Sequence, residues 1–366
     1  MPVIWEEPMS IERPDLSQLD PAARAYIESL EAELDRLRQG EAASEAAEEP
    51  EAPAEPGEPP TTINLITVSA GGIAKRTPRH LYSRQRRGGM GVFDLEAPEA
   101  DRLAFLALAD ASQSLILITN LARAFRVRVD DLPESPVRSR GQSLTASLSL
   151  LRDEHPAAVL PYQDRGYVAV LSWRGYARCL RYHLFSERMN PGMTLYNFKD
   201  FGAPSAACWT PGDADLLIAT RRGNAIRFGE KLLPVAGGLG IRLDPDDAAV
   251  TIAAVRPESG VLAVGGDGKG AIRLMSGFNP NKAPGGGGKR VMKTDRLVGA
   301  VTIDQTDDIF IISRLGKIIR FRAAEVPAKE GVVQGVNCIA LRADDTVAVL
   351  NSPAAAPSVS ASEGRA

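Results

Sequence analysis

A repeat is the feature that most constrains how this chain can fold. Six segments share one pattern, in which a short apolar run is followed by a small or hydroxyl residue, a turn, and a strand that carries a basic residue. The third copy has its basic residue one place early, at Arg178. A repeat of this length indicates one structural unit per copy. The segments close at positions separated by 50, 53, 48, 46 and 47 residues, namely Arg76, Arg126, Cys179, Arg227, Arg273 and Arg320.

Each copy predicts about four short strands. The turn carries a glycine at the same offset in four copies, because a tight reversal favours a residue without a Cβ. Ala122 and Lys269 break this offset. A second glycine-bearing stretch and an apolar strand complete each copy. Strands at this spacing indicate an all-β chain, and radial repetition of four-stranded sheets gives a six-bladed β-propeller over residues 61–351. The alternative is a non-repetitive pair of β-sandwiches. The four turn glycines are Gly72, Gly175, Gly223 and Gly316.

Residues 1–40 predict a short coiled-coil-like helix ahead of the propeller. Asp20 and Pro21 form a helix start, and Gly40 a stop. Because an isolated helix of this length is marginal, its apolar seam needs a second surface. The helix either packs on its own body or frays, or it makes a homodimer or docks on a partner through residues 21–39. The seam consists of Ala23, Ile27, Leu30, Leu34 and Leu37.

The two signs of charge are segregated along the chain. The formal net charge of −3 combines four Arg and sixteen acidic residues in 1–60, a net of −12, with 39 basic and 30 acidic residues in the remainder, a net of +9. Residues 41–60 contain seven Glu, with Ala and Pro, and predict a disordered acidic linker. Residues 352–366 predict a disordered tail of low complexity. The body that repeats is therefore basic.

Several classes of protein are not expected. No apolar run is long enough to span a membrane, and the N-terminus lacks the order of a signal peptide. Cys179, Cys208 and Cys338 are widely separated, which argues against a disulfide framework or a zinc cluster and favours a cytoplasmic location. The sequence has no P-loop, and its three His are too few for metal or triad chemistry. We therefore expect no metal and no cofactor.

Basic residues are most concentrated in thirteen residues of the first copy, 75–87, which contain no acidic residue. Six like charges predict an exposed segment that faces water or a polyanion. Gly88 and Gly89 follow, and glycines let backbone N–H groups approach phosphates closely. Arginine predominates, which suits bidentate phosphate contacts. The charged residues are Lys75, Arg76, Arg79, Arg84, Arg86 and Arg87, with His80 among them.

The stretch QRRGGMG at 85–91 resembles the seven-residue box of the C-terminal domain of the DNA gyrase A subunit. Six of the seven positions match, and Met90 replaces the usual last basic residue. The six repeats over 61–351 are also similar to that domain's six-bladed β-pinwheel. The resemblance implies a module that wraps double-stranded DNA around a basic rim. It assigns the box to Gln85, Arg86, Arg87, Gly88, Gly89 and Gly91.

The resemblance also proposes which basic residues line the rim. Residues at the closing position of each copy are candidates, together with neighbouring cations and three that follow the glycine-rich turn of the fifth copy. These candidates are Lys75, Arg76, Arg79, Arg84, Arg126, Arg178, Arg227, Arg273, Lys289, Arg290, Lys293, Lys317 and Arg320.

In a full gyrase A subunit, the pinwheel follows a breakage-reunion domain with a catalytic Tyr, for which this chain shows no counterpart. We therefore expect a stand-alone pinwheel that is not an enzyme by itself and that binds and bends DNA without sequence specificity in the nucleoid. The alternatives are the wrapping part of a split type II topoisomerase, docked to a topoisomerase subunit, or a propeller scaffold for an acidic protein. The acidic linker either serves as a spacer or competes with DNA for the rim.

Overall fold

The computed structural model describes residues 20, 27, 58–96, 98, 100–332 and 334–353. The chain divides into two compact units, Met1–Pro56 and Gly57–Ala366. In the first unit Ile27 is helical, and the rest of the predicted helix lies outside the described residues, as does most of the predicted linker. The predicted tail is corrected at its start, because Ser352 ends a strand and is buried.

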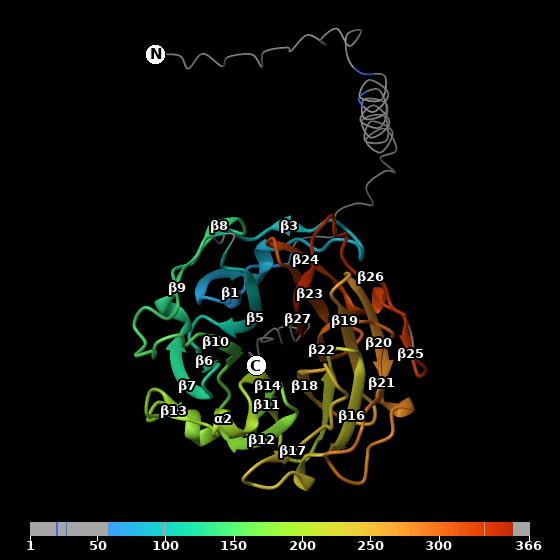
Figure 1. Cartoon of the computed structure of the whole chain (residues 1–366). Helices are drawn as coiled ribbons and strands as arrows, with labels where there is room; N and C mark the ends of the chain where they lie inside the picture. The colour runs from blue at the N-terminus through green and yellow to red at the C-terminus, as the bar shows by residue number, and fades with distance from the viewer. Residues whose placement is uncertain are drawn as a thin grey trace, which may run out of the picture. The chain divides into compact units, whose positions relative to one another are not determined.

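The second unit is a ring of six β-sheets, which confirms the six-bladed propeller (Figure 1). We number the sheets as blades 1 to 6 in chain order. The first and second strands of the blades form hairpins, which are β1 (Ile63–Ser69) with β2 (Ile73–Pro78), β6 (Ser114–Thr119) with β7 (Arg123–Arg128), β11 (Tyr167–Ser172) with β12 (Tyr176–Arg181), β15 (Asp215–Thr220) with β16 (Asn224–Gly229), β19 (Gly260–Gly265) with β20 (Lys269–Leu274), and β23 (Asp308–Ser313) with β24 (Lys317–Arg322).

The third strand of each blade pairs with its first strand and lies nearest the ring axis (Figure 1). A 3-10 turn follows the second strand of each copy, as η2 (Arg79–Leu81) does in the first. A short α-helix, α2 (Phe198–Phe201), precedes the third strand of blade 3. The third strands are β5 (Leu103–Asp110), β10 (Pro156–Pro161), β14 (Pro204–Thr210), β18 (Ala249–Val255), β22 (Leu297–Ile303) and β27 (Thr346–Ser352).

The outer strand of each blade comes from the following copy. Blade 1 takes β9 (Gln142–Ser143), blade 2 β13 (Met193–Thr194), blade 3 β17 (Gly238–Leu239), blade 4 β21 (Lys289–Arg290), and blade 5 both β25 (Ala328–Lys329) and β26 (Val336–Asn337). Blade 6 takes its outer strand, β3 (Val92–Phe93), from the first copy. The ring is therefore closed by a segment more than 220 residues earlier in the chain.

The hairpin turns explain the two irregular copies. Ala122 itself adopts the left-handed conformation, with φ 54°, where other copies have glycine. In the fifth copy the left-handed residue is Gly268, with φ 78°, which lies one place before Lys269. Leu217 and Leu262 are each the third residue of the first strand in their copies. Leu217 pairs with Arg227, whereas Leu262 pairs with Ile272, so Arg273 lies one residue beyond the position of Arg227. The alignment of the fifth copy by its arginine was therefore wrong by one residue.

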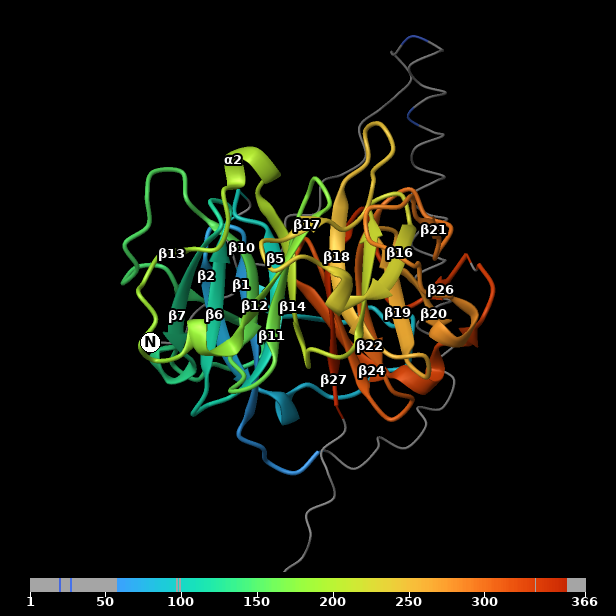
Figure 2. The same cartoon turned by 90° about the horizontal axis from the view of Figure 1, so that it is seen from below.

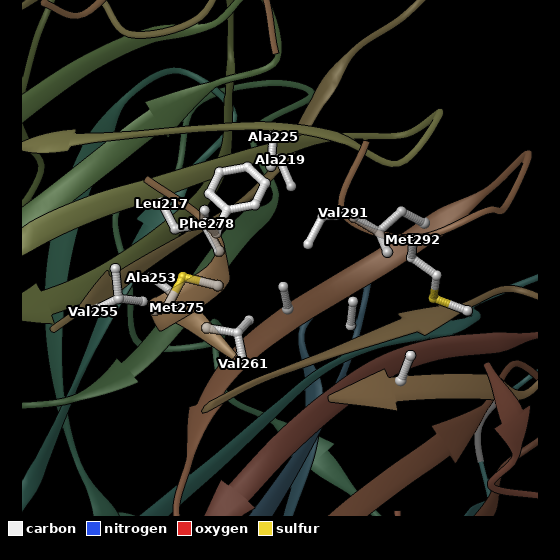
Figure 3. Packing of buried hydrophobic residues seen from close by; sticks show 14 residues of the cluster. Leu217, Ala219, Ala225, Ala253, Val255, Val261, Met275, Phe278, Val291 and Met292 are labelled. Atoms are coloured by element: carbon white, nitrogen blue, oxygen red, sulfur yellow. The ribbon is translucent and has the colours of Figure 1, made fainter. Parts of the chain in front are cut away.

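The hydrophobic core lies between successive blades. First strands such as β6 and β23 are buried along their whole length, which explains their nearly continuous apolar sequences. Figure 3 shows one interblade cluster, in which Phe278 and Met275 of the turn after β20 pack against Leu217 of blade 4. Each second-strand-to-turn segment therefore fills the space beside the preceding blade.

The six sheets stand side by side when the ring is viewed from the side, and the outer strands form its circumference (Figure 2). Among the described residues, no helix is long and apolar enough to cross a membrane.

Candidate nucleic-acid interface

The box at residues 85–91 lies where the first copy meets blade 6. Residues 85–94, which we call the closing segment, run along β24 and the loop after it. The backbone N–H of Gln85 donates to the carbonyl of Arg320 at 2.7 Å, and Gly88 donates to Cys338 at 2.9 Å. The N–H of Ala340 donates to the carbonyl of Gly89 at 2.9 Å. These bonds join the two ends of the ring.

The glycines of the box are required by close packing. Gly91 has φ 69°, and a Cβ there would lie 2.6 Å from the carbonyl oxygen of Ile318. A Cβ on Gly89 would lie 2.9 Å from Oε1 of Gln85, the same atom that accepts the Gly91 N–H at 3.1 Å. Gly88 has φ 83°. These residues let the closing segment approach blade 6, so their first role in this structure is to hold the ring shut.

The two arginines of the box have different surroundings. The Arg87 guanidinium donates to the carbonyls of Glu325 at 3.0 Å and Asn337 at 2.6 Å, and its backbone N–H donates to the Glu325 carboxylate at 2.7 Å. Arg86 is exposed, and so is Met90. Arg86 is therefore the box cation that can reach a phosphate, while Arg87 fastens the closing segment to the sixth copy.

A buried charge cluster anchors the end of the closing segment. Nζ of Lys75 lies 2.7 Å from Oδ1 of Asp94, and both side chains are fully buried. The Asp94 carboxylate also accepts hydrogen bonds from the hydroxyls of Tyr82 and Thr67, each at 2.6 Å. Burial lowers the pKa of Lys75 despite this partner, and burial together with the negative charge of Asp94 raises the pKa of Tyr82 well above its usual value. Lys75 is thus a structural cation.

Several other predicted rim residues are also structural. The guanidinium of Arg320 contacts Asp308, with Nε 2.7 Å from Oδ2, and donates to the carbonyls of Arg79 at 3.1 Å and Tyr82 at 3.0 Å. Arg227 repeats this arrangement with Asp215 at 2.7 Å and the carbonyls of Met275 and Phe278 at 2.8 and 3.1 Å. In both cases a second-strand arginine binds the 3-10 turn of the next copy.

The remaining copies show variants of this contact. Arg126 donates to the carbonyl of Phe185 at 2.9 Å and lies over the ring of Tyr162. Arg178 donates to Leu195 at 2.5 Å, and Arg273 to Gly277 at 3.3 Å. Arg76 is partly buried, and its backbone forms an isolated parallel β-bridge with Glu134.

Burial therefore corrects the sequence-based set of rim residues. Five of its members are in the interior and bound to protein groups, so they are removed from the candidate interface. The expectation that the whole of 75–87 is exposed was wrong, because acids distant in the sequence pair with two of its cations in the interior: Lys75 pairs with Asp94, and Arg79 pairs with Glu58. The five buried cations are Lys75, Arg79, Arg227, Arg273 and Arg320.

Glu58 corrects the predicted extent of the acidic linker. It belongs to the propeller unit, its side chain is 13% exposed, and it forms ion pairs with Arg79 and, at 2.6 Å, with Arg320. Burial alone would raise the pKa of Glu58, but the hydrogen bonds and charges of the two arginines outweigh it and lower that pKa below 4.5. The last acid of the linker thus balances the arginine cluster under the closing segment.

Glu58→Gln is expected to lower the free energy of unfolding at pH 7 by about 1–3 kcal/mol, because two buried arginines lose a charged acceptor. A depressed folded-state pKa stabilises the fold above the unfolded value and is lost as the pH falls through the folded value. The difference from wild type should therefore shrink below pH 4.5. Urea unfolding at pH 7 and pH 3.5 measures this, with the exposed Glu258→Gln as control; an equal difference at both pH values would contradict it.

The exposed cations lie on or beside the outer strands. From the sequence-based set, these are Arg86 of the closing segment, Arg84 just before it, and Lys289, Arg290 and Lys293 at β21. The box residues Gln85 and Gly88, and Lys317 in β24, are half-buried. The guanidinium of Arg290 donates to the carbonyl of Arg222 at 2.8 Å, which holds it against blade 4.

Further exposed cations were missed from the sequence. Arg138 and Arg140 stand beside β8 (Ser139–Arg140), which pairs in parallel with β4 (Leu95–Glu96), and their side chains are 71% and 90% exposed with Glu96 between them. The signal was present in the repeat, because each copy has a basic residue shortly before its second glycine stretch. These residues are Arg86, Arg140, Arg188, Lys231, Lys282 and Lys329, all exposed.

The described residues contain no cluster of three or more side chains suited to a metal ion. All three cysteines are free, and burial raises the pKa of Cys179 to about 12, so that its thiol is not primed for reaction.

Comparisons with known proteins also indicate a six-bladed β-propeller of a known kind. The family model for the DNA gyrase C-terminal domain, a β-propeller, matches residues 64–110, 113–149, 214–256 and 307–351. The propeller has the fold of the gyrase A C-terminal domain. Among solved structures, the DNA gyrase A C-terminal domain superposes with a TM-score of 0.72 at 18% identity, covering 80% of this chain and all of that one. The C-terminal domain of DNA topoisomerase IV gives 0.57 at 19% identity, covering 79% and 93%.

Curated relatives of known sequence also match most of this chain. The DNA gyrase A subunit of Mycobacterium leprae is 28% identical over 297 residues, which are 77% of this chain and 23% of that protein. The corresponding protein of Salmonella typhimurium is 28% identical over 295 residues, which are 77% of this chain and 34% of that protein. The chain therefore spans about a third or less of the length of these relatives.

Proposed function

We propose that this gyrase-type propeller binds duplex DNA without sequence specificity along its outer strands and bends it around the ring. The observation that carries the proposal is the recurrence of an exposed basic residue before the second glycine stretch of every copy, so that each of the six copies presents a cation at the surface. Phosphate contacts of this kind are independent of sequence, and a curved row of them favours bent DNA.

We also propose that the bent DNA serves a type II topoisomerase. The relatives are DNA gyrase A subunits, and a topoisomerase IV domain shares the fold, which supports a partner of the topoisomerase class. The chain itself is expected to supply DNA geometry rather than strand cleavage or ATP hydrolysis. A scaffold for an acidic protein would use the same cations but would show no effect on DNA topology.

The test combines binding and topology. Anisotropy of labelled duplexes of unrelated sequence should give equal affinities that fall steeply with salt. Ligation of nicked plasmid in the presence of the protein should shift the linking number. Salt-insensitive or absent binding with an unchanged linking number would overturn the proposal.

The two arginines of the box are expected to have different roles, Arg86 in DNA contact and Arg87 in the stability of the fold. Arg86→Ala is expected to weaken DNA binding roughly 3- to 10-fold and to leave the urea midpoint unchanged, since its side chain is exposed. Arg87→Ala is expected to lower the free energy of unfolding by about 1–3 kcal/mol, because it leaves carbonyls of the sixth copy without a donor. Equal effects of the two changes on both measurements would contradict this division.

A further inference from the structure

The outer strands present one equivalent position on every blade. It is the residue opposite the first residue of the second strand, as Ser143 is opposite Ile73. Four of the six residues at this position are polar, as expected for a surface that meets water or phosphates. The six are Ser143, Thr194, Leu239, Arg290, Asn337 and Phe93.

Phe93 departs from this polar pattern at the ring closure. Its side chain is 50% exposed, and the neighbouring Val92 and Met90 are 44% and 56% exposed. No fold requirement explains the exposure, because the backbone of β3 already pairs with Ile318 and Lys317 whatever the side chains are. We call Met90, Val92 and Phe93 the apolar strip.

Cations surround the apolar strip. The guanidinium carbon of Arg138 lies 5.7 Å from the centroid of the Phe93 ring, and Nζ of Lys317 lies 5.5 Å from it. Arg86 is exposed in the same segment. The acids nearby are already engaged, since Asp94 is buried against Lys75, and Glu96 accepts from Arg138 at 2.9 Å. A protein partner for this strip would have to be acidic and apolar together, whereas a DNA base step beneath its phosphates offers both properties.

We propose that Phe93 is a wedge that inserts between base pairs of bound DNA and kinks the duplex at the junction of blades 6 and 1. The proposal rests on the proposed DNA binding and adds a bending mechanism to it. Apolar side chains flanked by cations act in this way in proteins that bend DNA from the minor groove, where unstacking one step is compensated by the longer contact with the bent duplex. Arg138 and Lys317 would then hold the phosphates on either side of the opened step.

Leu239 supports a second kink of the same kind. It occupies the equivalent position on blade 3 and is 49% exposed. Blade 3 is three blades from blade 6 in a ring of six, and β17 and β3 lie on opposite sides of the ring (Figure 1). Its neighbour is the glycine loop before Lys289, where a Cβ on Gly285 would lie 3.3 Å from the Leu239 carbonyl oxygen.

The experiment uses the full chain and a short duplex with a central TA step, which unstacks readily. One form carries 2-aminopurine beside the step to report unstacking, and another carries a fluorophore pair on its ends to report bending. Wild type is expected to raise the 2-aminopurine signal and the energy transfer. Phe93→Ala is expected to lose at least half of both signals and to leave the salt dependence of binding unchanged, because the cations remain. Phe93→Leu should retain most of both.

The matched control is Leu315→Ala, an exposed apolar residue of blade 6 that lies in a hairpin turn rather than on an outer strand. It should behave as wild type. Salt-dependent binding by wild type without a 2-aminopurine signal, or equal signals from wild type and Phe93→Ala, would overturn the wedge and leave the proposed function standing. Absent binding by wild type would overturn both. A change in oligomeric state with unchanged bending would assign the strip to a protein contact and overturn the wedge.

Discussion

Asp94→Ala is expected to lower the free energy of unfolding by about 3–5 kcal/mol, because it leaves the ammonium of Lys75 buried without its counter-ion. Both side chains are fully buried, and Nζ of Lys75 lies 2.7 Å from Oδ1 of Asp94. The hydroxyls of Tyr82 and Thr67 lose their hydrogen-bond acceptor in the same change. The loss should be seen as a lower urea midpoint and a lower Tm. Since Asp94 lies at the end of the closing segment, the first region to lose hydrogen-exchange protection should be the junction of blades 6 and 1.

A double variant separates the charge from the packing. Lys75→Met alone removes the cation and keeps an apolar stem, and in combination with Asp94→Ala it should recover at least half of the lost stability, because no unpaired charge remains buried. The exposed pair Arg256 and Asp213, 2.8 Å apart, provides the control, and Asp213→Ala should change stability by less than about 1 kcal/mol. Additive effects of the Lys75 and Asp94 changes would contradict the pairing.

Removing three outer-strand cations together, by Arg86→Ala, Lys289→Ala and Lys293→Ala, is expected to have the largest effect on DNA binding. Each phosphate contact contributes about 0.9 to the slope of log affinity against log salt, so the slope should fall by about 2.7. The loss of affinity relative to wild type should then be on the order of 40-fold greater at 50 mM than at 200 mM salt. Anisotropy titrations over this range measure it.

The control for this triple variant carries the same change of charge away from the outer strands. Arg152→Ala, Arg165→Ala and Arg256→Ala remove three exposed arginines from the segments and turns that connect blades. If DNA follows the outer strands, this variant should keep a slope near that of wild type. Equal loss of slope in both variants would show that net charge alone, and not the position of the cations, governs binding.

The six-bladed fold was predictable because its information is local. Each copy contains a hairpin whose apolar runs and turn can be recognised within about ten residues, and a repeat of such units leaves few arrangements that bury their faces. Even the irregular turns obey this rule once seen, since Ala122 and Gly268 both take the left-handed conformation. The bounds of the outer strands were less predictable, because each has only two residues and pairs with a neighbouring copy.

The candidate interface was only partly predictable. Arg86, Lys289, Arg290 and Lys293 are exposed as expected, whereas Arg320, which looked equivalent by its place in the repeat, is buried. Its partners, the carbonyls of Arg79 and Tyr82, are 241 and 238 residues away in the sequence. A sequence pattern shows that a position prefers a cation, but not whether the cation serves a carbonyl, a carboxylate or a phosphate.

The sequence by itself determined the number of blades, the basic character of the body and the segment in which the box lies, because these follow from periodicity and composition within each copy. The tertiary structure alone decided which cations face outwards, because burial depends on the strand that each copy donates to the blade before it. It also decided that the closing segment comes from the first copy, because β3 pairs with β24 and so covers an edge of the sixth blade that would otherwise be unpaired.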